Sequence, residues 1–187
     1  MRIIGGTRRG LKLAKVGEGD AAAHLRPTSD RVREAIFNLL INGTYGNLVS
    51  GARVLDLFAG TGALGLEALS RGAEAAVFVD DGAKAMGLLR ENIARMRAEA
   101  VTRVMRQNAT CLPPNPEAPF SLVFLDPPYG KGMGEAALAA ALKGGWLAPG
   151  ATVVWEEGTA PAPPEGFTLI DQRRYGDTHV TLMTAPA

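Results

Sequence analysis

From residue 52 onwards, short apolar runs alternate with segments of helical periodicity. The expected strands are 53–58, 75–80, 103–107, 121–125 and 152–156, and the expected helices among them are 63–71, 84–97 and 135–143. Continuous apolar strands are typical of strands buried on both faces, and strands that alternate with helices are typical of a parallel sheet. The pattern therefore predicts an α/β fold with a mostly parallel sheet covered by helices on both sides.

Two further regions flank this alternating part. After a proline-rich loop, strand-like runs at 167–173 and 180–184 are joined by a turn near Gly176, which predicts a closing antiparallel hairpin. At the other end, 3–4 and 11–13 suggest a short hairpin, and a helix begins at Thr28 or Ser29 and ends near Asn42. We therefore divide the chain into a hairpin-and-helix extension at 1–50 and a main domain at 51–187.

Charge is distributed unevenly along a chain whose formal net charge is only +1. Residues 1–33 contain eight Lys and Arg against three Asp and Glu, a net charge of +5, and the remainder contains 12 against 16, a net charge of −4. A basic segment on a mildly acidic body is typical of an arm that binds a polyanion such as nucleic acid, although a solvated, flexible arm has the same composition.

Other features of composition narrow the class of protein. No apolar run approaches the roughly 18 residues that cross a membrane, and the N-terminus turns to glycine and arginine too early for a secretory signal. The single cysteine, Cys111, cannot form an intrachain disulfide, and no cluster of Cys and His suggests zinc. We expect a cytoplasmic, monomeric protein with neither a metal nor a membrane partner.

A glycine-rich turn joins the first expected strand to its helix, in the sequence Val-Leu-Asp-Leu-Phe-Ala-Gly-Thr-Gly at 54–62. Its glycines permit positive φ and close approach of a ligand, at the strand ends where open α/β sheets bind ligands. Gly65 completes the dinucleotide spacing, so spacing does not exclude NAD. Asp56 distinguishes S-adenosylmethionine from NAD, because a carboxylate at this position attracts the cationic methionine end of the former and repels the pyrophosphate of the latter. The cofactor contacts expected from this turn are Asp56, Phe58, Ala59, Gly60, Thr61 and Gly62.

Further residues are placed to hold a nucleoside. Asp80 ends the second strand, where a carboxylate accepts hydrogen bonds from ribose hydroxyls, and Asp81 can substitute for it. Such a carboxylate serves NAD and S-adenosylmethionine equally, and helix capping is the alternative role. Asn108 and Ala109 follow the third strand and are expected at the adenine edge, with an ordinary Asx-turn as the alternative for Asn108.

The strongest signal is Leu-Val-Phe-Leu-Asp-Pro-Pro-Tyr at 122–129, an apolar strand that ends in a carboxylate, two prolines and an aromatic ring. Prolines fix φ and remove N–H donors, which leaves rigid carbonyls at the site. Asp126 and the Pro127 carbonyl can accept both hydrogens of an exocyclic base amine and free its lone pair, and Tyr129 can stack on the base. The expected catalytic residues are Asp126, Pro127, Pro128 and Tyr129. The alternative is a Pro-Pro turn with an incidental aspartate.

The two motifs resemble motifs IV and I of the amino-methyltransferases. Four further segments are similar to the bacterial 16S ribosomal RNA guanine-N2 methyltransferase family, RsmD: Arg-Ile-Ile-Gly-Gly at 2–6, Arg-Gly-Leu-Lys-Leu at 9–13, Arg-Pro-Thr-Ser-Asp-Arg-Val-Arg-Glu-Ala-Ile-Phe-Asn at 26–38 and Leu-Glu-Ala-Leu-Ser-Arg-Gly at 66–72. The resemblance covers about residues 2–157. Asp80 stands where the family usually has glutamate, and Thr61 where it usually has serine.

The resemblance implies a seven-stranded, Rossmann-like class I fold, S-adenosylmethionine as methyl donor, and one guanine of 16S rRNA in a 30S subunit or assembly intermediate as target. It also gives the basic segment a role in RNA binding, expected from Arg8, Arg9, Lys12, Arg26, Thr28, Arg31 and Arg33. A base methylated on its amine has to leave its stack, and RNA recognition favours such splayed-out bases.

Three other functions stay open at this point. A DNA adenine-N6 or cytosine-N4 methyltransferase shares the Asp-Pro-Pro-Tyr chemistry but generally needs an extra target-recognition domain. A non-catalytic RNA-binding module would keep the fold without needing an intact Asp126, Pro127 and Tyr129. An NAD oxidoreductase would need an acid/base pair for hydride transfer, and the sequence suggests none.

Overall fold

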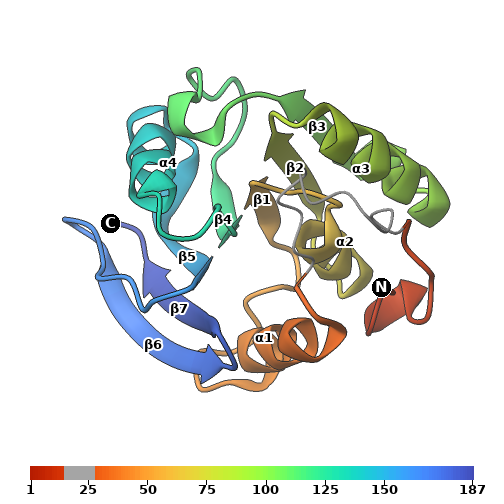
Figure 1. Ribbon diagram of the computed structural model, residues 1–187, viewed down its shortest axis with the longest axis horizontal. Coiled ribbons are helices and arrows are strands. Elements are labelled where there is room, and N and C mark those ends of the chain that lie inside the picture. The colour runs from red at the N-terminus through yellow and green to blue at the C-terminus, as the bar shows by residue number, and fades with distance from the viewer. Residues whose placement is uncertain (15–27) are drawn as a thin grey trace.

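The computed structural model describes residues 1–14 and 28–187 and shows a twisted sheet with helices on both faces (Figure 1). The strands are β1 (Arg53–Leu57), β2 (Ala75–Asp80), β3 (Thr102–Arg106), β4 (Phe120–Leu125), β5 (Leu147–Glu157), β6 (Thr168–Tyr175) and β7 (Thr178–Thr184). The α-helices are α1 (Asp30–Asn42), α2 (Ala63–Ser70), α3 (Ala83–Met96) and α4 (Met133–Lys143). Short 3₁₀ turns are η1 (Gly6–Arg8), η3 (Glu99–Val101) and η4 (Ala109–Cys111).

The sheet has seven strands in the order β3-β2-β1-β4-β5-β7-β6. Strands β1 to β5 pair in parallel, and β7 pairs antiparallel with both β5 and β6. The predicted fold class, a mostly parallel sheet with a C-terminal antiparallel hairpin, is confirmed. Because the strand order reverses between β1 and β4, a crevice is expected at the carboxyl ends of these two strands, where open α/β sheets bind their ligands.

Alternating strand residues bury two separate apolar clusters, one on each face of the sheet. Val54, Phe78 and Phe124 belong to the cluster that α1, α2 and α3 cover, whereas Leu55 and Val123 belong to the cluster that α4 covers. A side-chain period of two explains this division, since successive residues of a strand point to opposite faces. The sheet is therefore buried on both sides, as its apolar strands predict.

The N-terminal segment forms less regular structure than the predicted hairpin. Its two arms meet at one antiparallel bridge, between Arg2 and Lys12, and the connection contains the 3₁₀ turn η1. Gly6 adopts a φ of 75°, and a Cβ there would lie 1.8 Å from the Ser70 carbonyl oxygen, so the turn packs tightly on the end of α2. This close packing favours a compact turn over a longer two-stranded ladder.

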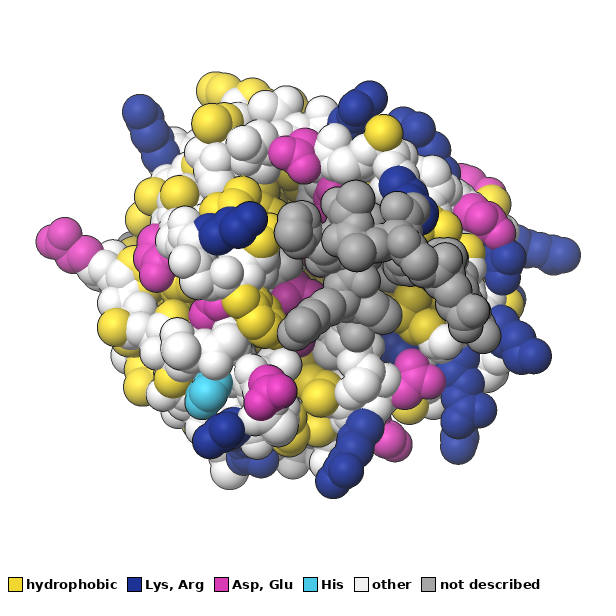
Figure 2. All heavy atoms as spheres, in the orientation of Figure 1, with side chains coloured by type: hydrophobic (Ala, Val, Ile, Leu, Met, Phe, Trp, Pro, Cys, Tyr) yellow, Lys and Arg dark blue, Asp and Glu magenta, His cyan; other side chains and the backbone are white. Residues whose placement is uncertain are grey.

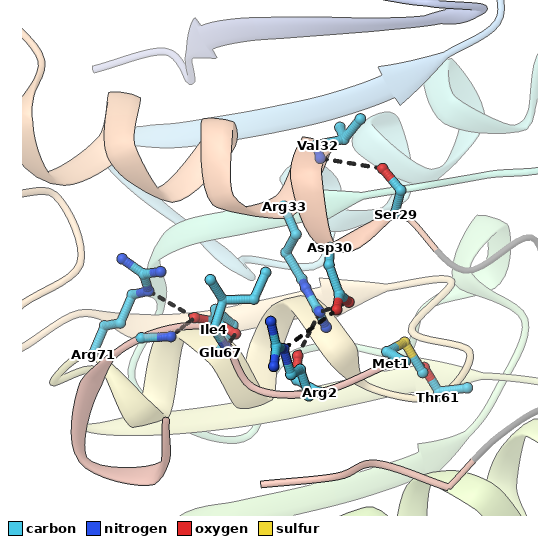
Figure 3. Close-up of polar contacts among 11 residues, drawn as sticks. Met1, Arg2, Ile4, Ser29, Asp30, Val32, Arg33, Thr61, Glu67 and Arg71 are labelled. Atoms are coloured by element: carbon cyan, nitrogen blue, oxygen red, sulfur yellow. Dashed lines mark hydrogen bonds and ion pairs between the residues drawn. The ribbon is translucent and has the colours of Figure 1, made fainter. Parts of the chain in front are cut away.

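Glu67 of α2 anchors the N-terminal segment to the main domain (Figure 3). Its fully buried carboxylate accepts hydrogen bonds from the backbone N–H groups of Ile4 (2.9 Å) and Gly5 (2.8 Å) and from Nε of Arg71 (2.8 Å). Ile3 is also fully buried, in the cluster under α1, α2 and α3. The division of the chain near residue 50 stays a prediction, and the apolar cluster crosses that boundary.

We expect Glu67→Ala to lower the free energy of unfolding by about 3–5 kcal/mol, because it leaves two backbone donors and a guanidinium without their buried acceptor. Urea denaturation followed by circular dichroism measures the loss. Glu74→Ala is the matched control, since Glu74 is exposed and its carboxylate has no partner among the described residues. Equal stability of the two variants would contradict the anchoring role.

Candidate active site

Acidic residues at the carboxyl ends of four strands lie on one face of the sheet. In the sheet register, Asp56 of β1 is level with Phe78 of β2 and with Phe124 of β4. Asp80 lies two residues after Phe78, and Asp126 lies two residues after Phe124. Phe124 is in turn level with Val154 of β5, which lies two residues before Glu156. Because side chains repeat every second residue, all four carboxylates share the face that α1, α2 and α3 cover. This carboxylate edge defines the candidate site.

The glycine-rich turn has the backbone geometry that the sequence predicts. Gly60 and Gly62 adopt φ values of 55° and 79°, and Phe58 also lies in the left-handed region at 58°. Left-handed backbone at a non-glycine residue is uncommon and is stabilised only where the surroundings hold it. Here the N–H of Ala59 donates to the Val79 carbonyl (3.0 Å), which fixes the turn to the end of β2.

Asp80 fastens the same turn from the neighbouring strand. One carboxylate oxygen accepts from the N–H of Gly60 (2.9 Å) and the other from the N–H of Gly82 (2.9 Å). An ionised carboxylate has about four lone-pair sites, so acceptor capacity remains for ribose hydroxyls. The side chain of Asp81 is exposed and makes no hydrogen bond within the described part of the chain. The geometry thus favours Asp80 over Asp81 for the predicted ribose contact.

Asp56 is buried beneath the glycine turn, with 2% of its surface exposed. One oxygen accepts from the N–H of Gly65 (2.9 Å), and a Cβ at Gly65 would lie 2.4 Å from the Phe78 ring. Burial raises the pKa of Asp56 well above its usual range, the Gly65 bond opposes this rise, and the charges of Asp80 and Glu156 add to it. Its predicted contact with the methionine end of a cofactor remains a prediction.

Three further predicted cofactor residues are placed as follows. Asn108 caps η4, with its side-chain oxygen accepting from the N–H and hydroxyl of Thr110 (2.9 and 2.7 Å), so the Asx-type turn is present. Ala109 is buried in η4. Thr61 is buried, and its carbonyl accepts from the side-chain amide of Asn92 (2.9 Å). The predicted contact of Asn108 with adenine is still available to its amide nitrogen, which has no partner among the described residues.

The Asp-Pro-Pro-Tyr corner follows directly from the end of β4. The N–H of Asp126 donates to the Leu57 carbonyl (3.4 Å), so the corner lies beside the end of β1. The Tyr129 hydroxyl is 3.2 Å from that of Thr178, and a Cβ at Gly158 would lie 3.0 Å from the tyrosine ring. Burial raises the pKa of Tyr129 to about 12, so the phenol stays neutral at physiological pH. The ring is therefore fixed in place at the site.

Glu156 is a site residue to which sequence reasoning gave no particular role. It is 2% exposed, and both its oxygens are within reach of the Thr28 hydroxyl, which donates at 3.1 and 3.2 Å. Thr28 also opposes the rise in the pKa of Asp126 that burial causes. The Thr28 hydroxyl thus connects Glu156 to the segment just before α1, whose N-cap is Ser29. The position of Glu156 at the end of an apolar strand was the available signal.

Burial raises the pKa of both Glu156 and Asp126. Burial raises the pKa of Glu156 to about 7, and the Thr28 hydrogen bond and the charge of Arg33 act against the rise. Burial also raises the pKa of Asp126 well above its usual range, and the charges of Glu156 and Asp56 add to this. The charge of Glu156 thus disfavours ionisation of Asp126, and burial disfavours ionisation of both carboxyl groups.

Arg33 does not reach solvent, which corrects its expected role in contacting rRNA phosphates. The side chain is fully buried and its Nη2 donates to the Arg2 carbonyl and to Asp30, both at 2.6 Å (Figure 3). Nε and Nη1 have no hydrogen-bond partner among residues 1–14 and 28–187. Burial lowers the pKa of Arg33, and the charges of Glu67, Asp30 and Glu156 oppose this fall. The residue follows Val32 on the helix and turns inward with the apolar stripe, where it supplies positive charge beside the carboxylate edge.

The other predicted RNA-binding residues differ in their surroundings. Arg8, Arg9, Lys12 and Arg31 are exposed, whereas Thr28 is turned toward Glu156. Arg26 lies outside the described residues. In Figure 2, Lys and Arg side chains gather at the lower right, over the N-terminal segment and α1. Binding of RNA by this face stays a prediction.

The described parts of the chain contain neither a candidate metal site nor a candidate membrane-spanning helix. Among residues 1–14 and 28–187, no group of three or more His, Cys, Asp or Glu is arranged to hold a metal ion. Within the same ranges, no helix is both long and apolar enough to cross a membrane.

Comparisons with known proteins agree with this geometry. A family model described as "Conserved hypothetical protein 95" matches residues 1–184. The chain is 38% identical to Ribosomal RNA small subunit methyltransferase D of Escherichia coli K12 over 94% of this chain and 85% of that protein. It belongs to the RsmD family. A 40% match to the putative rRNA methyltransferase YlbH of Bacillus subtilis covers 69% of the chain and 67% of that protein.

Solved structures of methyltransferases share this fold. A putative methyltransferase from E. coli, yhhF, superposes with a TM-score of 0.82 at 36% identity and covers all of this chain and 98% of that one. The N-methyltransferase NodS of Bradyrhizobium japonicum, solved with S-adenosylhomocysteine, has a TM-score of 0.63 at 13% identity, covers 84% and 87%, and shares the fold. The predicted Rossmann-like class I methyltransferase fold is confirmed.

We expect the stability of the RsmD-family chain to fall as pH rises from about 5 through about 7. Unfolded Glu156 ionises near its ordinary pKa of 4.5, whereas the folded residue keeps its proton to about 7, so the folded state binds more protons over this window. Glu156→Gln should flatten the slope without abolishing it, because Asp126 contributes with the same sign. Urea titrations at half-unit pH steps measure this.

The control for this experiment is Glu165→Gln, because Glu165 is exposed and has no partner among the described residues. Its pH profile should follow that of the wild type. A Glu156→Gln profile as steep as the wild-type one would show that Glu156 is not the group with the raised pKa.

Proposed function

We propose that this protein is an S-adenosylmethionine-dependent methyltransferase that modifies the exocyclic N2 of one guanine in 16S rRNA. The observation that carries the proposal is Asp126, at the start of a rigid Pro-Pro-Tyr corner, beside the end of β1 and the glycine turn. The rRNA methyltransferase names of its relatives support the same substrate. Small-subunit RNA, free or in an assembling 30S particle, is the proposed partner, and the cytoplasm is the proposed location.

The residues present fit S-adenosylmethionine, which supplies an electrophilic methyl group when bound. Asp56, Asp80, Asp126 and Glu156 make the edge acidic, which favours a cationic sulfonium and opposes the pyrophosphate of NAD. The glycine turn would approach the ligand through its backbone. Asp80 would hold the ribose hydroxyls with the acceptor capacity that its two backbone bonds leave free.

In the proposed reaction, Asp126 and the Pro127 carbonyl orient the guanine amine by accepting its two hydrogens. A C–N bond forms between the amine and the methyl carbon while the C–S bond breaks, and its electron pair stays on sulfur. The nitrogen then releases one proton to the ionised member of the Asp126–Glu156 pair. The neutral Tyr129 ring holds the base flat by stacking, worth about 1–3 kcal/mol. Orientation and fixed acceptors supply most of the rate enhancement.

The alternative functions have less support. A DNA methyltransferase is disfavoured because the relatives at 38% and 40% identity are named as rRNA methyltransferases. A non-catalytic RNA-binding module would not need the buried Glu156 and the partly buried Asp126 beside a glycine turn. An NAD oxidoreductase is disfavoured by the acidic charge of the edge.

An assay of the radioactively labelled product tests which RNA base receives the methyl group. Tritiated methyl groups from S-adenosylmethionine should pass to 16S rRNA, naked or in 30S particles, and nucleoside chromatography should identify N2-methylguanosine. A product containing only methyladenine would refute the guanine assignment and leave the fold intact. A rise in melting temperature with S-adenosylhomocysteine, and none with NAD, should accompany the activity.

Asp126→Ala should lower kcat by at least about 100-fold with cofactor binding retained, because it removes a preorganised acceptor at the reacting nitrogen. Single-turnover methyl transfer and S-adenosylhomocysteine titration by calorimetry measure the two effects separately. Asp177→Ala is the matched control, since Asp177 is exposed in the turn between β6 and β7. A fully active Asp126→Ala enzyme would remove Asp126 from the chemistry.

A further inference from the structure

A hollow of about 390 Å³ lies beside α1, apart from the residues that the proposed reaction uses. Its lining residues are Arg31, Glu34, Ala35 and Asn38 of α1 and Arg71 at the end of α2. Arg31, Glu34 and Asn38 are spaced by three and four residues, so they share one face of the helix. The volume falls within the range of about 300–1,000 Å³ that is typical of small-ligand sites.

The polar groups around the hollow have unused hydrogen-bonding capacity. Nε of Arg71 donates to the Glu67 carboxylate at 2.8 Å (Figure 3). The guanidinium carbon of Arg71 also lies 5.2 Å from the centre of the Phe37 ring. Its two Nη atoms have no hydrogen-bond partner in the described part of the chain. Arg31 and Glu34 form no hydrogen bond or ion pair within residues 1–14 and 28–187, although they lie three residues apart. Asn38 uses only its side-chain oxygen, which accepts from Asn42 (2.8 Å).

The charges of the lining residues favour a phosphodiester with a polar body. Two guanidiniums at one hollow suit a phosphate, because arginine presents a planar fork of donors that matches its oxygens. The N–H of Arg8 donates to the Ser70 hydroxyl (2.9 Å), so the exposed arginines of the N-terminal segment continue this basic surface. Glu34 opposes a second anion and accepts hydrogen bonds from the hydroxyls and amines of a nucleoside.

Arg31, which lines the hollow, is close in sequence to a residue that contacts the carboxylate edge. Thr28 contacts Glu156 at that edge, and Arg31 follows three residues later. Three residues span at most about 11 Å, so the backbone of Arg31 lies within about 11 Å of Thr28.

We propose that the hollow is a subsite for one unstacked nucleotide of the substrate RNA, next to the target base. Arg31 and Arg71 hold its phosphate, and Glu34 and Asn38 hold its ribose or base. This inference rests on the proposed function, because it takes rRNA as the substrate. Recognition of single-stranded nucleotides through splayed bases and ribose hydroxyls is typical of sequence-specific RNA binding.

Binding of a short single-stranded RNA, measured by fluorescence anisotropy at several salt concentrations, tests the subsite independently of turnover. Arg31→Gln should weaken binding and lower the salt slope by about one, as expected for one lost phosphate contact. Arg90→Gln is the matched control, because Arg90 is an exposed arginine on α3 with no partner among the described residues. Equal affinities of these two variants would overturn the phosphate contact.

Glu34→Gln distinguishes a nucleotide subsite from a merely basic surface. On a basic surface, loss of a negative charge strengthens RNA binding, whereas loss of a charged acceptor in the subsite should weaken it about tenfold. Glu135→Gln on α4 is the control, since Glu135 is likewise exposed on a helix and without a partner in the described ranges. Tighter or unchanged binding by Glu34→Gln would refute the subsite.

Turnover measurements distinguish failure of the subsite from failure of the proposed function. Arg31→Gln and Glu34→Gln should raise KM for rRNA with little change in kcat and with S-adenosylhomocysteine binding unchanged. If the wild type transfers no methyl group to rRNA, the proposed function fails. If the wild type is active and both variants bind and turn over like their controls, the subsite alone fails.

Discussion

Concentration of carboxyl groups at one edge of the sheet is the constraint on which the rest of the site depends. Burial of a carboxylate is unfavourable unless hydrogen bonds or opposite charges compensate. The chain compensates each group differently: Asp80 and Asp56 accept backbone N–H groups, and Glu156 accepts the Thr28 hydroxyl. Arg33 adds the charge of a buried guanidinium. A cationic ligand would complete this compensation, which links the stability of the edge to its proposed chemistry.

The same constraint explains why the N-terminal segment packs so closely on the main domain. Thr28 and Arg33 reach the carboxylate edge only if α1 lies across the sheet, and Arg33 is also bonded to the backbone of Arg2. Glu67 then holds the first residues of the chain against α2. Residues of the N-terminal segment that the sequence suggests as an RNA-binding arm therefore also form part of the site. The exposed arginines belong to the same segment.

Much of the fold could be predicted from the sequence because its signals are local. Apolar runs, helical stripes and the glycine turn mark elements that the structure confirms to within a few residues; β5, which begins at Leu147 rather than 152, is the main exception. The predicted RNA contact of Arg33 was wrong, because charge alone predicts an exposed side chain. The burial of Arg33 depends instead on Asp30, Arg2 and acidic groups that are distant in the sequence. Glu156 was given no particular role because its partner Thr28 is 128 residues away in the chain.

The way in which the glycine turn is held has a consequence for ligand affinity. Backbone bonds from Ala59 and Gly60 and the Asn92 amide on Thr61 fix the turn through contacts within the protein. Conformational entropy that a mobile loop would lose on binding is here lost during folding. Association with a nucleoside should therefore resemble entry into a rigid receptor, with an on-rate set by diffusion and desolvation rather than by loop ordering.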